Sequence, residues 1–261
     1  MKKIFFLFIA TIIVLPSIAQ NEKKPLTKKQ EKRQNLNRII KQEEEGVITY
    51  IKHIAGGIKI TTDGYGGFLE LGRAKTVKKS MLFQFEVVET KHAKEFKQQV
   101  NFSSSQPIIY GKINFFYPIK FGVQQQILLG NKGNKNGVSI TGNVGGGISL
   151  GLLRPYLINV LDNGTQKFIG YNDDSTAFLN TSNYLSGPGF GKGWSKLKVA
   201  PGVYIKPAVR FDYGKFNEMI NALEVGATLE YYTKKVPQMV FSKQEQLFFS
   251  AYVSLIFGKR K

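Results

Sequence analysis

Histidine and serine are the side chains with which this chain could catalyse hydrolysis. The sequence holds two histidines, His53 and His92, and the run Ser103–Ser105 follows the second closely enough to supply a Ser–His pair. No acidic residue is placed to orient either histidine, and an isolated histidine is usually a surface residue. The absence of Cys excludes thiol nucleophiles, thiolate zinc sites and disulfides. The residues therefore predict a protein that is not an enzyme and has no catalytic, cofactor or metal site.

Two glycine-rich segments with lysine invite comparison with phosphate-binding loops. They are Gly130-Asn131-Lys132-Gly133 and the run from Gly187 to Gly193. Neither has the Gly-Lys-Ser/Thr sequence of a Walker loop after the required upstream glycine, and neither opens a helix after a buried strand. Both segments are typical of surface loops.

Charged residues also recur at every second or fourth position within otherwise apolar segments. In a β-strand such positions share one face. If that face were enclosed, opposite charges on it would have to pair with one another. A register centred on Asn217 would place Arg210 opposite Glu224 and Lys206 diagonal to Glu230. The expected network comprises Glu86, Lys120, Lys206, Arg210, Asp212, Glu224 and Glu230, with Glu70 on the same face.

The segments that must position these charges alternate with a period of two. In residues 199–213 every odd position is apolar, while the even positions other than Tyr204 are small or charged. Residues 222–231 repeat the arrangement. Most such segments exceed the 5–6 residues of an average soluble strand and reach the roughly 9–11 residues that cross a bilayer. We expect eight strands, at 57–72, 79–91, 108–130, 137–152, 154–162, 197–213, 219–232 and 246–258.

The first residues have the features of a secretory signal. Met1-Lys2-Lys3 is basic, Ile4–Leu15 is apolar but too short to span a membrane, and Ser17-Ile18-Ala19 fits a signal-peptidase site. We therefore expect a signal peptide at 1–19, a basic periplasmic segment at 20–56 and a folded domain at 57–261. Residues 21–46 are rich in Lys and Arg and could dock on another envelope protein.

An exported chain with long alternating strands is typical of a transmembrane β-barrel. We predict an all-β, antiparallel, up-and-down barrel in the outer membrane, with the apolar face towards lipid. Short inner connections are expected at 152–154 and 214–218, and outer loops at 131–136, 163–196 and 233–245. Arg at Val225 or Leu229 should then be poorly tolerated, whereas Gly226→Ser and Thr228→Ser should be mild.

The chain resembles the small outer-membrane β-barrel proteins of Bacteroidota. The resemblance lies in the Ala19/Gln20 junction, the glycine-rich segment Gly142–Gly151 and the amphipathic final strand Leu247–Phe257, and it covers residues 57–261. It implies a barrel but no particular activity. The chain departs from the pattern at its end, where Phe257 is followed by Gly258-Lys259-Arg260-Lys261 instead of closing the sequence.

The chain has 261 residues and a formal net charge of +19, which in a cytoplasmic protein would suggest nucleic acid. Export argues against nucleic acid and favours anionic lipids. On the outer face, Lys132, Lys135, Lys192 and Lys196 would contact phosphates of membrane lipids or lipopolysaccharide. The sequence is compatible with two functions. One is a non-enzymatic structural or interaction subunit with a side-chain-filled lumen, and the other is a small-solute channel, which would need a wider bore.

Overall fold

The computed structural model describes residues 51–261 except Val77, 100–105, 133–136, Asn163 and 215–217. It also describes five helical residues in the basic segment: Gln30, Glu31, Arg33, Gln34 and Asn37. The predicted signal peptide and most of residues 20–50 lie outside the described part of the chain. Among the described helices, none has the length and apolar character needed to cross a membrane.

The structure is dominated by β-strands. In chain order the elements are β1 (Lys52–Thr61), β2 (Gly64–Ala74), β3 (Lys79–Thr90), β4 (Lys97–Gln98), β5 (Ile108–Ile109), β6 (Asn114–Gly130), β7 (Ser139–Pro155), β8 (Leu157–Asp162), β9 (Thr165–Gly170), α2 (Ser175–Leu179), the 3-10 helix η1 (Thr181–Asn183), β10 (Tyr184–Ser186), the 3-10 helix η2 (Trp194–Lys196), β11 (Lys198–Asp212), β12 (Met219–Val236) and β13 (Glu245–Arg260).

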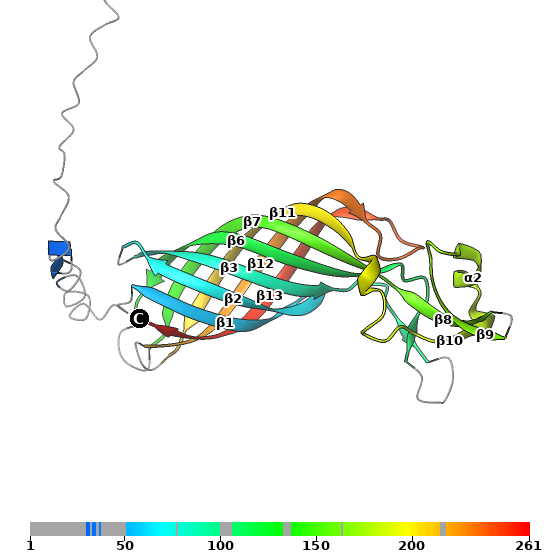
Figure 1. The fold of residues 1–261 in the computed structure, drawn as a ribbon. Helices are drawn as coiled ribbons and strands as arrows, with labels where there is room; N and C mark the ends of the chain where they lie inside the picture. Colours follow the sequence, from blue (N-terminus) through cyan, green and yellow to red (C-terminus); the bar gives the residue numbers. More distant parts are fainter. Residues whose placement is uncertain are drawn as a thin grey trace, which may run out of the picture. The chain divides into compact units, whose positions relative to one another are not determined.

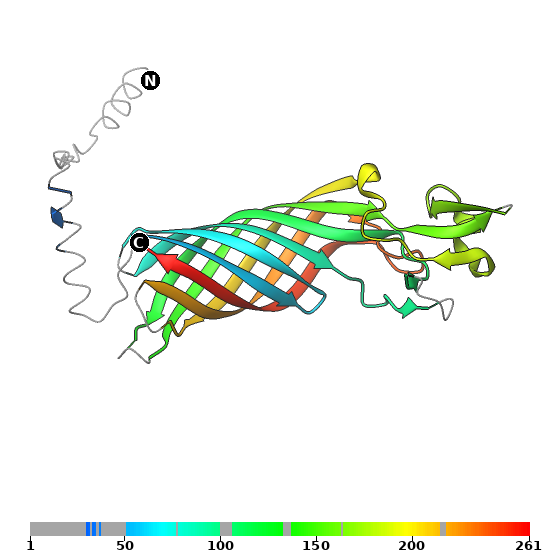
Figure 2. The ribbon, with the colours of Figure 1, turned by 60° about the horizontal axis from the view of Figure 1, so that its bottom comes forward.

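Eight of these strands form a closed barrel in the order β1-β13-β12-β11-β7-β6-β3-β2. Every neighbouring pair is antiparallel, and β1 pairs with β13 to close the sheet, as Figure 2 shows where the blue and red strands meet. The predicted all-β, up-and-down barrel of eight strands is therefore confirmed. Two small sheets lie outside the barrel, with the orders β10-β8-β9 and β4-β5.

The alternation in the sequence becomes an alternation between the two faces of the barrel wall. On β11 and β12, Val203, Ile205, Val225 and Leu229 are exposed on the outside, while the intervening polar side chains are buried inside. Such an arrangement inverts a soluble barrel, whose apolar side chains would fill the interior.

Three of the predicted strands are wrong in detail. The segment 57–72 is two strands, because the chain reverses at Thr62 and Asp63 between β1 and β2, so the barrel begins at Lys52 rather than at residue 57. The segment 108–130 divides into β5 and β6. Residues 152–154 make no connection, because β7 continues to Pro155, and the predicted strand 154–162 mainly becomes β8, which pairs with β9 and β10 outside the barrel.

The two ends of the barrel differ in what they carry. The end at which β1 begins and β13 ends, called here the terminal end, has the connections 75–78, 131–138 and 213–218. The opposite end has the turn at 62–63 and the longer connections 91–113, 156–197 and 237–244. The segment 131–136 was expected on the same side as 163–196, but its described residues, 131 and 132, lie at the terminal end, where Lys132 contacts Gly214.

Residues 156–197 fold into a separate structure at that opposite end, called here the cap (Figure 1). Its core combines its own apolar side chains with β5 and with Met239 of the connection 237–244. The Tyr156 hydroxyl accepts a 2.8 Å hydrogen bond from the Ile109 amide, and burial raises the pKa of Tyr156 to about 12. The buried residues of this core are Ile108, Ile109, Tyr156, Ile158, Val160, Ile169, Phe178, Tyr184 and Met239.

Candidate functional site

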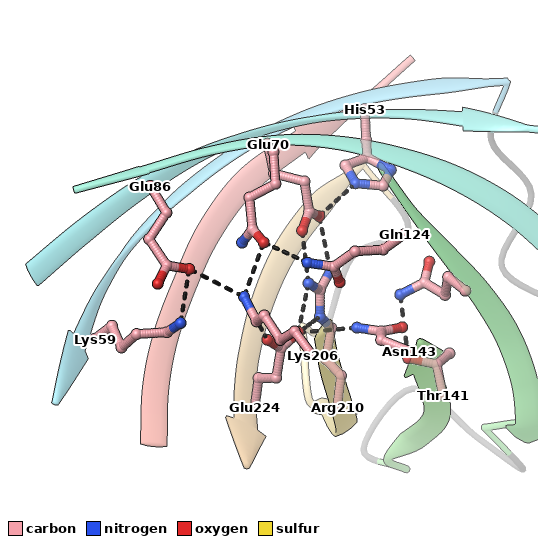
Figure 3. A network of polar contacts seen from close by, with 12 residues as sticks. His53, Lys59, Glu70, Glu86, Gln124, Thr141, Asn143, Lys206, Arg210 and Glu224 are labelled. Carbon is pink, nitrogen blue, oxygen red and sulfur yellow. Dashed lines mark hydrogen bonds and ion pairs between the residues drawn. The ribbon is translucent and has the colours of Figure 1, made fainter. Parts of the chain in front are cut away.

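Arg210 lies at the centre of a polar network inside the barrel. Its guanidinium donates to both carboxylate oxygens of Glu70, at 2.8 and 2.7 Å, and to Glu224 at 2.9 and 2.7 Å (Figure 3). Glu70 also contacts the Nε2 atom of His53 at 2.9 Å. Because two planar carboxylates occupy most of the guanidinium donors, Arg210 is held in a fixed orientation.

Glu86 lies near three lysine ammonium groups. Lys59 contacts one of its oxygens at 2.6 Å, Lys206 contacts the same oxygen at 3.2 Å, and Lys120 contacts the other at 3.2 Å. Lys206 also lies 3.7 Å from Glu224, which joins the Glu86 group to the Arg210 group.

Glu230 ends the network towards the cap. Lys120 contacts it at 2.5 Å, so this lysine bridges Glu86 and Glu230. The Tyr232 hydroxyl donates to Glu230 at 2.6 Å and lies 2.7 Å from the Ser149 hydroxyl.

Neutral side chains supply further hydrogen bonds. Asn143 donates to Glu224 at 2.9 Å, and the Tyr252 hydroxyl donates to its other oxygen at 2.8 Å. Lys206 donates to the side-chain oxygen of Gln84 at 2.8 Å, and the Gln124 amide donates to the same oxygen. Such bonds lower the cost of keeping ions away from water.

The network fills the lumen and balances its own charge. Its four cations are Lys59, Lys120, Lys206 and Arg210, and its four anions are Glu70, Glu86, Glu224 and Glu230; each is at most 5 % exposed. An apolar cluster that includes Phe116, Leu153 and Tyr232 fills the lumen beside it, towards the cap. An eight-stranded barrel has just enough interior for side chains, and here they occupy it.

Six of the seven residues expected in the charge network meet there, and Glu70, expected on the same face, joins them; the six are Glu86, Lys120, Lys206, Arg210, Glu224 and Glu230. Arg210 stands opposite Glu224 in the β11–β12 register. Lys206 is diagonal to Glu230 in that register, but its ammonium group contacts Glu86 instead. The seventh residue, Asp212, lies apart at the terminal end, where it pairs with Arg260 and lies 3.5 Å from Lys132.

The four lysines expected on one outer face are divided between the two ends. Lys132 is buried at the terminal end, where it donates to the Gly214 carbonyl oxygen at 2.6 Å, so its predicted contact with outer lipid phosphates is wrong. Lys135 lies outside the described residues. Lys192 and Lys196 are exposed on the cap; Lys192 lies over the Phe168 ring, and Lys196 is 3.4 Å from Asp173.

The sequence did not identify His53 and Lys59 as members of the lumen network. The prediction merged strand β1 with β2 and placed His53 before the barrel, so neither residue was assigned to the polar face. Residues 53–61 nevertheless alternate, with His53, Ala55, Gly57, Lys59 and Thr61 on one face, and that signal could have identified a separate strand. His92, the other histidine, lies in the connection 91–113, where its Nδ1 accepts from the Lys94 amide.

A second cluster fastens the cap to the barrel rim. The Arg154 guanidinium lies 4.1 Å from the centre of the Phe115 ring and 5.0 Å from that of Trp194. It donates to the carbonyl oxygens of Phe190 and Lys192, at 2.5 and 3.2 Å. On the same aromatic ring, Lys112 lies 4.3 Å from the Phe115 centre and pairs with Glu95 at 2.6 Å. The strand end of β7 is thereby tied to the loop 190–194.

Among the described residues, no three His, Asp or Glu side chains are grouped so as to hold a metal ion. Ser103–Ser105, the serines that follow His92 in the sequence, lie outside the described part of the chain.

No known protein family and no curated protein matches the chain. Solved structures that are similar to it include Neisserial surface protein A, with 10% identity and a TM-score of 0.37 over 81% of this chain and 96% of that one. The N-terminal barrel domain of OprF from Pseudomonas aeruginosa has 9% identity and a TM-score of 0.35, over 80% and 98%. Ail, the attachment invasion locus protein of Yersinia pestis, has 11% identity and a TM-score of 0.37, over 82% and 100%.

Proposed function

We propose that this chain is an outer-membrane β-barrel that acts as a non-enzymatic structural or interaction subunit of the cell envelope. The observation that carries the proposal is the lumen, which is filled by a buried and charge-balanced network of side chains.

The exposed outer surface of the barrel supports the membrane location. Apolar side chains project from every strand of the wall, and among them Ile54, Leu69, Val203, Ile205 and Phe249 are more than half exposed. A water-soluble protein rarely exposes so continuous an apolar surface, whereas a bilayer requires one. The closed strand order leaves no unpaired edge, which a bilayer also requires.

The cap supports the interaction role. It has its own buried core, and the Arg154 cluster fixes it to the rim, so it presents a formed surface at the end of the barrel opposite the start of β1. Exposed side chains at this end include Phe190, Phe241 and Lys192, which suit a partner with apolar and anionic groups.

A small-solute channel is the alternative function, and conductance tests it directly. The mature protein would be refolded in detergent and inserted into planar bilayers beside the triple variant Glu86→Ala/Lys120→Ala/Lys206→Ala, which removes side chains from the lumen. We expect no discrete current from the native protein and measurable current from the variant, which serves as the positive control. Steady native current would overturn the filled-lumen proposal.

Location needs its own test. We expect the mature chain in the outer-membrane fraction, with gel mobility that changes on boiling, because a closed barrel resists detergent until heated. Recovery in the soluble periplasmic fraction would overturn the membrane proposal.

The basic segment 21–46 is proposed to dock on an envelope partner from the periplasm. An affinity pull-down from solubilised outer membrane would compare the native chain with a variant lacking residues 21–46 but retaining the signal peptide. A partner lost only from the shortened chain is expected; an identical set of proteins from both would contradict the proposed docking.

A further inference from the structure

Four basic residues lie close together where β1 pairs with β2 and β13, and three of them are directly side by side. Lys52 of β1 is opposite Arg73 of β2 in the register. On its other side, Lys52 exchanges two backbone hydrogen bonds with Lys261, at 2.8 and 2.7 Å, which places these residues directly opposite. Lys259, two residues before Lys261, is opposite Ile54 and shares the outward face. All four cations are exposed at the terminal end.

No carboxylate among the described residues forms an ion pair with these four cations. Like charges directly opposite each other in a sheet are destabilising, and here two such pairs adjoin. The arrangement contrasts with the lumen, where each cation of the network has an anionic partner. An anion bound at this site would remove the repulsion.

Directly beneath the cations the outer wall is hollowed into an apolar groove of about 700 Å³. Gly56 forms its floor, because this outward position has no side chain and lies between Leu69 and Phe257 in the registers of β1 with its two neighbours. Leu69 and Phe257 are 62 % and 55 % exposed and form the walls. The lining includes Lys52, Arg73, Lys259 and Lys261, so groove and cations form one continuous site.

We propose that this site binds one anionic phospholipid from the membrane leaflet that surrounds the terminal end of the barrel. Its phosphate would lie between the cations, and an acyl chain would lie in the groove over Gly56. A free phosphate would satisfy the cations alone, whereas an amphiphile satisfies the cations and the groove together. The inference rests on the proposed membrane location and adds to it a lipid class and a position.

The test uses the mature protein refolded in zwitterionic detergent, after its boiling-dependent gel shift has been checked. Equimolar phosphatidylglycerol and phosphatidylcholine with identical acyl chains are added, and the lipids retained are counted by native mass spectrometry. We expect the native protein to prefer phosphatidylglycerol by roughly tenfold, since each nearby cation strengthens binding of an anionic headgroup. Arg73→Gln/Lys259→Gln should abolish most of that preference.

Two further variants separate the parts of the site. Lys235→Gln/Lys243→Gln removes the same charge from exposed positions at the opposite end and should keep the preference. Gly56→Leu fills the groove without changing charge and should reduce retention of phosphatidylglycerol. An added side chain there would first meet the flexible end of Leu69, at 3.2 Å, so the barrel should still form.

The outcomes distinguish this inference from the location proposal. A protein that shows the gel shift but retains both lipids equally overturns the lipid site and leaves the barrel proposal standing. Equal loss of preference in the control variant, or undiminished retention in Gly56→Leu, also overturns the site. A protein without any gel shift overturns the membrane proposal itself.

Discussion

Arg210 and Glu70 form a bidentate ion pair across the full diameter of the barrel. Arg210 is on β11 and Glu70 is on β2, and three strands separate these two along the wall in either direction. Backbone pairing holds each strand to its neighbours only, so this contact joins opposite walls directly. It acts as a strut that sets the cross-section of the lumen.

Removing the cation of this strut should lower the free energy of unfolding more than removing an exposed cation does. Arg210→Met leaves Glu70 and Glu224 without their main partner in a site closed to water, so we expect a loss of about 3–5 kcal/mol in the free energy of unfolding. The measurement is urea unfolding of refolded protein in detergent. Lys196→Gln, which breaks an exposed pair with Asp173, is the control and should change stability by less than about 1 kcal/mol.

A compensated variant separates charge from volume. Arg210→Met combined with Glu70→Gln removes one charge of each sign and leaves Glu224 3.7 Å from Lys206, so it should recover much of the loss. If the two changes instead add independently, the side chains are not coupled as the distances indicate.

The two faces of β12 should respond differently to substitution. Val225→Arg places a charge on the proposed lipid face and should cost roughly 2–4 kcal/mol, whereas Thr228→Ser on the lumen face should be mild. Gly226→Ser, expected from sequence to be mild, should not be: an added Cβ would lie 2.6 Å from the Pro207 carbonyl oxygen and 2.8 Å from the Tyr252 ring. Equal tolerance of Val225→Arg and Thr228→Ser, measured by urea unfolding, would argue against a lipid-facing wall.

The sequence predicted the barrel because period-two alternation depends only on neighbours along one strand. It also placed Arg210 opposite Glu224, because a hairpin register follows from a short turn. The partners of Lys206 and Glu70 could not be predicted in this way. They depend on how far the closed sheet is sheared, and thus on which residues of distant strands share a level of the lumen.

The close contacts of glycines on the lumen face also show which residues share a level of the lumen. An added Cβ at Gly72 would meet the ring of His53 and no other side chain among its nearest atoms. Gly72→Ala should therefore push His53 away from Glu70 and lower stability, while His53→Ala/Gly72→Ala should relieve the clash. Thermal unfolding of the native protein and the three variants, His53→Ala included, measures the coupling; strict additivity would refute it.

Arg154 should control the order of the loop that carries the only tryptophan of the chain. Arg154→Met removes the stacking on Phe115 and Trp194 and the two bonds to loop carbonyl oxygens, with an expected local loss of about 2 kcal/mol. Trp194 fluorescence should become more accessible to iodide, while the boiling-dependent gel shift remains. Arg154→Lys keeps the charge without the planar stack and should resemble Arg154→Met; native-like quenching in both would exclude this role.

The cap should weaken at alkaline pH. Burial raises the pKa of Tyr156 and of Tyr184 to about 12, from an ordinary value near 10. The stability that these neutral hydroxyls contribute is complete below pH 10 and is lost between pH 10 and about 12, because the unfolded chain ionises first. Cap unfolding followed by Trp194 fluorescence should shift to lower temperature in that window. The shift should be smaller in Tyr156→Phe, and a constant transition temperature to pH 12 would contradict the expectation.

The strut between Arg210 and Glu70 also constrains the order of folding events. The two residues are 140 positions apart, so their contact closes a very long loop and cannot form before most of the chain is synthesised. Until then the inner face of the growing sheet carries unneutralised charge that only water can solvate. The last step of assembly must therefore combine pairing of β1 with β13 and expulsion of water from the charged interior, and a kinetic barrier is expected at that closure rather than at the formation of any single hairpin.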